Sequence, residues 1–478
     1  ETITVKAKVT DSGSSLTGVK TPDGVSTVFM TLPGVNTIIE EDGEVTSKVE
    51  APNEGGSVDI TATTTDSGWI NLIQKQFDEQ GELIAEETKQ FQPGSKITVT
   101  GGALVRSETK IEGNDKGSVT ITDDEGNEVE TKLETQIPSE IRETEDGSIE
   151  ASATGKDSQG EDVGLIATAK VDGRVEHSVK VGSKETKATS EIEGAQTTIK
   201  SDGVETSVEV KSTPTSNAVD LVVSADNDGK SEHLLVIKDA AGNETGRVKA
   251  KSDIPGTKTS IKQDQSGKAF VETSVTVLGT QDEKLDIKVS GNVDGEATHE
   301  IQLTLESGET VTTKADFKIP GASTQISQEG SVETTASLGE GTQKKLIKVN
   351  ANPNGTASHA ISFQDSTGKT ITTSAISEVK GAETAIAPTG VVSTSAVPRS
   401  GISTEGFFIR AVVETRPDGE SITFFEKVDT NTNQVLQTFR TNAASTPFEP
   451  DNKAKIREVA GEPILEIEAG VSRTLLFE

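Results

Sequence analysis

The stretch AFVETSVTVLGTQDEKLDIKVSGNVDGEATHEIQLTLESGETVTTKADF, residues 269–317, decides the fold. Apolar and polar residues alternate within it, and the alternating runs end at turn-forming pairs such as Asp294-Gly295 and Ser307-Gly308. A period of two is typical of half-buried strands, and such pairs between two runs favour a hairpin. The pattern therefore predicts an antiparallel meander of five strands, at 257–262, 269–277, 285–289, 299–305 and 310–317.

All four histidines of the chain occupy the same position in a repeated phrase, four residues after a turn glycine. The phrases are DGRVEH at 172–177, DGKSEH at 228–233, DGEATH at 294–299 and NGTASH at 354–359. A residue that recurs once per repeat belongs to a building unit, whereas a catalytic residue is needed once. The histidines therefore predict a repetitive structural protein.

A second marker, usually glycine or Pro-Gly before a Thr/Ser-rich stretch, gives the length of the repeat. It recurs at 33, 93, 138, 193, 255, 320 and 380, with spacings of 60, 45, 55, 62, 65 and 60 residues. Such a period indicates tandem modules, a solenoid or propeller blades. We expect a partial repeat at 1–31, repeats at 32–91, 92–136, 137–191, 192–253, 254–318, 319–378 and 379–442, and a C-terminal strand tail or cap at 443–478.

The second of these repeats is short, and we expect it to lack one hairpin. Only 31% of all residues are hydrophobic and 3% aromatic, so each unit buries little apolar surface. Either the units pack against their neighbours or the chain is partly disordered, and the alternation of apolar and polar residues favours folded β structure. We expect an all-β fold that builds an elongated rod or filament subunit. The alternative is a seven-bladed β-propeller, although propellers pack large apolar side chains between their blades and the middle of this chain has few.

Charge and composition exclude several classes of protein. The 78 acidic residues outnumber the 46 basic ones, which disfavours nucleic-acid binding and favours a solvated, self-repelling surface. Without cysteine the chain forms neither disulfides nor thiolate metal sites. No run reaches the roughly 18 apolar residues of a membrane helix. Because the sequence begins at Glu1, we expect a protein secreted after signal-peptide removal to an extracellular or cell-surface location.

Two groups of residues are candidates for metal binding. The histidines could hold zinc or copper only if successive repeats stack in register or if chains pack laterally, so we expect each to cap a hairpin strand with one edge buried instead. Acidic turns at 40–43, 123–127 and 226–229 offer oxygen ligands for calcium. Asp-Gly pairs are also what a tight hairpin turn requires, so we expect turns and no cofactor, with calcium as the alternative.

We do not expect an enzyme. The sequence has no serine elbow between a strand and a helix, no phosphate loop and no dinucleotide fingerprint. Paired carboxylates for glycoside hydrolysis remain an alternative, but 78 acidic residues make their presence uninformative. A propeller that recognises a glycan or another ligand is the other alternative.

Residues 1–10, ETITVKAKVT, form one predicted strand that belongs to no complete repeat, with Ile3, Val5, Ala7 and Val9 on one face. An unpaired strand edge binds another strand. We expect it either to complete the first module of its own chain or to enter another copy and build a head-to-tail homopolymer. The expected acceptor surface consists of Phe407, Phe408, Phe424, Phe425, Phe439, Ile464, Leu465, Ile467, Leu475, Leu476 and Phe477. The predicted function is a surface filament or adhesin-like stalk, with a surface or glycan as a further possible contact.

Overall fold

The computed structural model describes the chain except residues 1–3, 10–14, 22–23, 31, 33, 54–55, 101–102, 123–126, 145–146, 212–217, 279–282, 340, 399–405, 441–452, 460–461, 468–470 and 475–478. Its regular elements are strands, apart from the short 3-10 turn η1 (Gly341–Gln343). The all-β prediction is confirmed. Within the described ranges, no helix has the length and apolar character needed to cross a bilayer.

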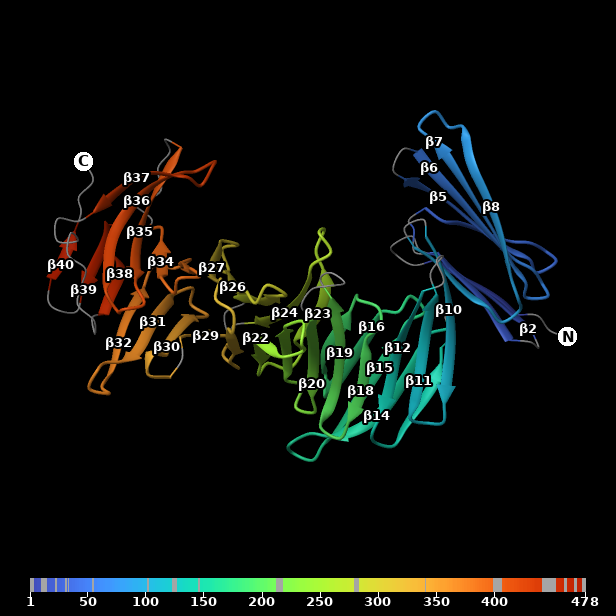
Figure 1. The fold of residues 1–478 in the computed structure, drawn as a ribbon, viewed down its shortest axis with the longest axis horizontal. Helices are drawn as coiled ribbons and strands as arrows, with labels where there is room; N and C mark the ends of the chain where they lie inside the picture. The colour runs from blue at the N-terminus through green and yellow to red at the C-terminus, as the bar shows by residue number, and fades with distance from the viewer. Residues whose placement is uncertain are drawn as a thin grey trace. The chain divides into compact units, whose positions relative to one another are not determined.

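The strands follow one another as antiparallel meanders (Figure 1). A group of three comes first: β1 (Thr4–Val9), β2 (Ser15–Thr21) and β3 (Gly24–Met30). A separate five-stranded sheet follows: β4 (Asn36–Ile39), β5 (Val45–Asn53), β6 (Gly56–Thr64), β7 (Ile70–Asp78) and β8 (Leu83–Phe91). The next meander has four strands: β9 (Lys96–Thr100), β10 (Ala103–Glu112), β11 (Lys116–Thr122) and β12 (Glu128–Thr135). The short repeat therefore lacks one strand, and our expectation that it lacks a hairpin was wrong.

Five-strand groups occupy the middle of the chain. The first holds β13 (Ser139–Glu143), β14 (Ile149–Lys156), β15 (Asp162–Ala169), β16 (Val175–Val181) and β17 (Lys184–Ser190). The second holds β18 (Gln196–Lys200), β19 (Gly203–Lys211), β20 (Ala218–Asp226), β21 (Ser231–Lys238) and β22 (Glu244–Ser252). The third holds β23 (Lys258–Gln263), β24 (Ala269–Leu278), β25 (Lys284–Asn292), β26 (Ala297–Thr304) and β27 (Thr310–Phe317).

Two further five-strand groups and a three-strand tail complete the chain. The groups hold β28 (Ser323–Ile326), β29 (Val332–Leu338), β30 (Lys345–Ala351), β31 (Ala357–Gln364) and β32 (Thr370–Ser377), then β33 (Glu383–Ile386), β34 (Val392–Ala396), β35 (Phe407–Thr415), β36 (Ser421–Asp429) and β37 (Val435–Arg440). The tail holds β38 (Lys453–Val459), β39 (Glu462–Ile467) and β40 (Val471–Thr474). The last group and the tail are also antiparallel meanders.

The chain divides into two compact units. One contains Glu1–Ser178 with Thr189–Val208, and the other contains Val179–Ala188 with Glu209–Glu478. Within each unit, the last strand of a meander pairs in parallel with the first strand of the meander two places later. The pairs are β3–β9 and β12–β18 in the first unit, and β22–β28, β27–β33 and β32–β38 in the second. Alternate meanders therefore extend the same sheet.

Consecutive meanders pack face to face, for example β22 against β25 and β27 against β30. One core between them joins Ala250 of β22, Ile287 of β25 and Ile326 of β28, all buried. Each of these residues lies in an alternating strand, so its side chain points inward while its neighbours along the strand face solvent. The inner faces of these meanders therefore contribute to a shared core.

Candidate functional site

A histidine–threonine contact recurs between consecutive meanders. His299 is the third residue of β26 and 1% exposed, and its Nδ1 lies 2.8 Å from the Thr334 hydroxyl on β29 of the next meander. The same contact joins His177 to Thr206, His233 to Thr273 and His359 to Thr394, each at 2.7 Å. The third position of the fourth strand therefore links two facing sheets.

Each of these threonines also bonds the first strand of its own meander. The Thr334 hydroxyl lies 2.9 Å from that of Thr324 on β28. Equivalent pairs are Thr197–Thr206 at 2.8 Å, Thr259–Thr273 at 3.2 Å and Thr384–Thr394 at 2.9 Å. A hydroxyl has one donor and two acceptor lone pairs, so it can satisfy the ring nitrogen and its threonine partner together. The result is a three-residue polar chain inside an otherwise apolar core.

Burial keeps these histidines neutral. It lowers the pKa of His177, His233 and His359 to about 3 and that of His299 to about 4. All four histidines are at most 1% exposed, so the rings lie wholly inside the core, and our expectation of a strand cap with one buried edge was wrong in its burial. Among the described residues, no group of three or more His, Asp or Glu side chains is arranged to hold a metal.

The second ring nitrogen distinguishes His359 from the other three. Its Nε2 lies 2.8 Å from the Thr415 hydroxyl at the end of β35, whereas Nε2 of His177, His233 and His299 has no partner within the described part of the chain. Strand register explains the difference. Thr415 lies on the third strand, opposite Val392, which stands two residues before Thr394 on the second strand. In the two preceding meanders, the third-strand residue opposite the equivalent valine is Ala351 and Gly291. Neither of them has a hydroxyl.

A second recurring contact joins a hydroxyl on the last strand of one meander to the turn glycine of the next meander. The Thr313 hydroxyl on β27 donates to the Gly355 carbonyl at 2.9 Å, and Thr373 on β32 donates to Gly419 at 2.8 Å. Gly355 has a φ of 85°, a conformation that favours glycine, so the turn that precedes the histidine strand also presents this carbonyl. Thr131–Gly173 at 2.9 Å and Thr186–Gly229 at 2.5 Å repeat the contact.

The same hydroxyl also accepts a hydrogen bond from the connection that ends the next meander. Gly256 N, between β22 and β23, donates to Thr186 Oγ1 at 2.9 Å, and Gly194 N, between β17 and β18, donates to Thr131 Oγ1 at 3.1 Å. These are the glycines that mark the repeat period in the sequence. In these two cases the turn glycine and the marker glycine of one meander therefore bond the same threonine of the preceding meander.

The acidic turns use their oxygens within the turn. Asp226 Oδ1 accepts hydrogen bonds from the backbone N of Asp228 at 3.0 Å and of Lys230 at 2.9 Å, and burial raises the pKa of Asp226. In the turn at 40–43, Asp42 Oδ1 accepts from Glu44 N at 3.1 Å. Most of the turn at 123–127 lies outside the described residues. These bonds give the aspartates the turn role expected from Asp-Gly pairs.

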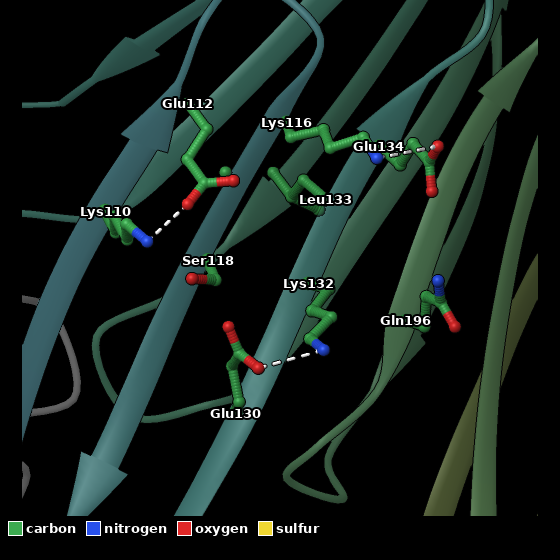
Figure 2. A pocket seen from close by; sticks show the side chains of 10 residues that line it. Lys110, Glu112, Lys116, Ser118, Glu130, Lys132, Leu133, Glu134 and Gln196 are labelled. Atoms are coloured by element: carbon green, nitrogen blue, oxygen red, sulfur yellow. Dashed lines mark ion pairs between the residues drawn. The ribbon is translucent and has the colours of Figure 1, made fainter.

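A shallow depression of about 280 Å³ lies over β10, β11 and β12 (Figure 2). Three ion pairs line it: Lys110–Glu112, Lys116–Glu134 at 3.7 Å and Lys132–Glu130 at 2.9 Å. Hydrogen bonds from the lysines lower the pKa of Glu112 and Glu130, so both carboxylates are ionised at neutral pH. A general acid needs the opposite shift. The charges here neutralise one another, as expected for a solvated sheet surface.

The predicted assembly strand pairs within its own chain. β1 is antiparallel to β2, with Ala7 opposite Thr17, and the Ala7 side chain is exposed. Val5 and Val9 lie in β1, and Ile3 lies outside the described residues. Among the described strands, β1 pairs with β2. This pairing agrees with the expectation that the strand completes its own module, and its entry into another copy stays a prediction.

The predicted acceptor residues have different environments. Phe425 and Leu465 are buried in the core between β36 and β39, and Phe407 and Phe439 pack against that core. They therefore stabilise the module and do not form an open apolar surface. Phe408, Phe424 and Ile464 are half-buried, and Ile467 lies in β39. Leu475, Leu476 and Phe477 lie outside the described residues.

The threonines that bind the histidines were not predicted from the sequence. A signal for their first-strand partners was present, because Thr197, Thr259, Thr324 and Thr384 each stand two residues before a buried isoleucine. This Thr-x-Ile pattern marks the first strand. It does not reveal that its threonine reaches a histidine through a second threonine, since that depends on how the sheets face each other.

Comparisons with known proteins provide no family. No family model matches the chain, and no curated protein sequence matches it. A mutant apocarotenoid oxygenase from Synechocystis is 9% identical over 77% of this chain and 70% of its own, with a TM-score of 0.17. The WD40 domain of SCAP from fission yeast is 10% identical, with coverages of 78% and 84% and a TM-score of 0.15. Prolyl oligopeptidase B from Galerina marginata is 9% identical, with coverages of 82% and 55% and a TM-score of 0.17.

Proposed function

We propose that this chain is an extracellular structural protein, a subunit of a β-rich surface filament or adhesin-like stalk that assembles head-to-tail with other copies. The recurrence of one meander-to-meander contact is the main support. The same hydroxyl–glycine bond joins Thr131 to Gly173 and Thr313 to Gly355, both at 2.9 Å. A contact that recurs between several pairs of successive meanders lets a sequence add length without a unique site.

The surface chemistry is consistent with such a role. The chain has a formal net charge of −32, and many exposed lysines pair with a neighbouring carboxylate, as Lys116 does with Glu134 at 3.7 Å. Pairs of this kind contribute little stability, but they keep a long sheet surface hydrated. We propose that this surface keeps the protein soluble at the cell exterior.

Main-chain pairing favours a continuous fibre over a propeller. β22 pairs in parallel with β28 through Lys249–Ser252 and Ser323–Ile326, so one sheet continues through alternate meanders. Propeller blades are separate sheets packed around a central channel.

Electron microscopy and light scattering of the purified protein test the proposal. We expect filaments in concentrated samples. Removing residues 254–378 deletes two five-strand meanders and preserves the alternation of sheets, so the subunit repeat should shorten while the filaments persist. Disc-shaped monomers that unfold after this deletion would instead support the propeller.

A further inference from the structure

Strand β8 is exposed on both faces over most of its length. Every residue from 83 to 88 is exposed, and Leu83 and Ile84 are 52% and 60% exposed. Within the described strands, β8 pairs with β7 and forms one edge of the five-stranded sheet. A sheet edge presents backbone N–H and C=O groups that can pair with another chain. β8 is therefore a candidate interaction surface.

The strand carries charged residues where another last strand contributes to the core. Lys89 lies opposite Leu72, the third residue of β7, as Ala315 of β27 lies opposite His299, the third residue of β26. Ala315 is 1% exposed, whereas the side chain of Lys89 is 30% exposed and forms an ion pair with Glu87 at 3.3 Å. The sequence of β8 therefore suits a hydrated surface or a polar interface, and not a core between two meanders.

β8 is also longer than the neighbouring strand edges. Among the described strands, β4 forms the other edge of the same sheet and has four residues, and β13 begins the next sheet and has five. β13 follows Pro138, which has no N–H group to donate. Short strands and proline protect an open edge from pairing with another chain. β8 has nine residues, none of which is proline or glycine, so it lacks both forms of protection.

The hydrogen bonds of β7 determine which peptide groups of β8 face the open edge. Thr65 N donates to Trp69 O at 2.8 Å and closes the β6–β7 hairpin. Hydrogen-bonded and non-hydrogen-bonded pairs alternate from there, so Thr64–Ile70 is not hydrogen-bonded and Ile70 directs its N–H and C=O towards Phe91 of β8. Every second residue before Phe91 bonds β7 in the same way. The residues whose peptide groups face the edge are therefore Glu86, Thr88 and Gln90.

We infer that β8 pairs with β8 of a second copy of this chain, antiparallel, about a two-fold axis at Thr88. Registers that join five or more residues of the regular stretch 85–91 are centred on Glu87, Thr88 or Lys89. Centring on Glu87 or Lys89 places like charges opposite each other, which is unfavourable. Centring on Thr88 joins all of 85–91 and lets the edge-facing peptide groups bond one another. The resulting pairs are Thr88 with Thr88, Glu87 with Lys89, Glu86 with Gln90, and Ala85 with Phe91.

The pairs of this register are favourable ones. Threonine opposite threonine and opposite charges across a strand pair both stabilise a sheet, and the two-fold axis provides the Glu87–Lys89 pair twice. An isologous contact of this kind closes on itself and gives a dimer. It goes beyond the proposed head-to-tail assembly, because it uses one internal strand of each copy. In subunits that are also joined head-to-tail, it would tie two filaments together.

Cysteine cross-linking tests the register, because the chain contains no cysteine of its own. Thr88→Cys places two cysteines opposite each other, with Cα atoms about 5.5 Å apart and within disulfide reach. We expect a covalent dimer under mild oxidation. The matched control is Gln90→Cys on the same face of the strand, which should stay monomeric alone and form a mixed dimer with Glu86→Cys. Equal cross-linking of Thr88→Cys and Gln90→Cys overturns the inference.

Charge reversal tests the affinity, measured by sedimentation of the full chain. Lys89→Glu places two carboxylates opposite each other at both charge pairs, and should raise the dissociation constant of the dimer at least about tenfold. The double variant Glu87→Lys with Lys89→Glu restores opposite charges and should restore the dissociation constant. If the double variant dimerises as poorly as the single one, the inference is wrong.

Hydrogen exchange identifies the paired groups without any substitution. The amides of Glu86, Thr88 and Gln90 should gain protection at least about tenfold as the protein concentration rises through the dissociation constant, while those of Glu87 and Lys89 change little. Protection of the first three amides in a monomeric chain would show that β8 pairs within its own chain and would overturn the inference. Filaments without this dimer leave the proposed function intact, and dimers without filaments leave this inference intact.

Discussion

The meander β9–β12 has four strands and the meander β28–β32 has five. This difference of one strand decides whether the opposite sheet continues past the meander. In an antiparallel meander, an odd number of strands returns the chain in its original direction, whereas an even number reverses it. The sheet that contains each meander continues in both cases, through β12–β18 and β32–β38. The opposite sheet continues past β28–β32 through β27–β33, but among the described strands β8 and β13 do not pair across β9–β12.

The same two meanders differ at the histidine position. In β28–β32 this residue is His359, opposite Ala375. In β9–β12 it is Gly117, opposite Leu133, and a Cβ there would lie 3.1 Å from Cγ2 of Ile149 on the next meander. Ile149 fills the space that a histidine ring fills elsewhere. The polar bridge therefore appears where the next meander presents threonine, whereas β14 presents Ala151 at the position equivalent to Thr334.

Changing the strand number of β28–β32 should have the largest effect. Removing residues 339–351 deletes β30 and leaves four strands, which should abolish the β27–β33 pairing and retain β32–β38. We expect the amides of Lys314–Phe317 and Glu383–Ile386 at that pairing to exchange hydrogen at least about 100-fold faster. This corresponds to a decrease of about 2.7 kcal/mol in the free energy of local opening. Removing 339–364 deletes β30 and β31 and keeps an odd number, so protection should persist. Equal loss in both deletions would contradict the role of strand number.

Acid should next separate the meanders that carry the buried histidine from a meander that does not. A histidine held neutral by burial binds fewer protons than its unfolded form between pH 6.5 and its folded pKa, about 3 for His359. Stability is therefore complete above pH 6.5 and falls as the pH decreases, by ~2 kcal/mol per histidine between pH 7 and pH 5.

Hydrogen exchange corrected for intrinsic rates measures this effect region by region. β26 and β31 should lose protection at pH 5, while β7, with buried Leu72 as its third residue, should change less. In His299→Leu, the response of β26 should resemble that of β7. An unchanged pH response in this variant would show that carboxylates, and not the ring, cause it.

The strands of the third five-strand group could be predicted from alternation and turn pairs. The strands expected at 269–277 and 310–317 appear as β24 (Ala269–Leu278) and β27 (Thr310–Phe317). Alternation reports which residues face inward, but not which meander they face. The parallel β22–β28 pairing joins residues more than seventy positions apart, and no local pattern records it. For the same reason the histidine position was evident in the sequence while its threonine partner was not.

Removing the threonine hydroxyl that bonds His299 should lower the free energy of unfolding by less than either change above affects its region. Thr334→Val leaves Nδ1 of His299 and the hydroxyl of Thr324 without their 2.8 Å and 2.9 Å partners. An unsatisfied buried polar group costs about 1–3 kcal/mol, and denaturant unfolding should show a loss of that size. Thr334→Ser keeps the hydroxyl and should lose less than half as much. If serine and valine cost the same, packing of the methyl group accounts for the effect.

The smallest expected change is an increase in the free energy of unfolding. It should follow from giving Nε2 of His299 a hydrogen-bond partner like that of His359. Ala351 occupies in β30 the place that Thr415 occupies in β35, and Nε2 of His299 has no partner among the described residues. Thr415 also bonds Ser421 at 3.0 Å, and the residue equivalent to Ser421 is Ala357. The double variant Ala351→Thr with Ala357→Ser therefore transfers the whole arrangement. A buried hydrogen bond contributes about 0.5–1.5 kcal/mol, and we expect denaturant unfolding to show a gain in that range.

Ala351→Val has nearly the same shape without the hydroxyl and should give no gain, because overpacking costs stability and nothing offsets it. If the valine variant gains as much as the threonine variant, the space beside His299 lacks only volume, and the hydroxyl of Thr415 is not what distinguishes the last histidine.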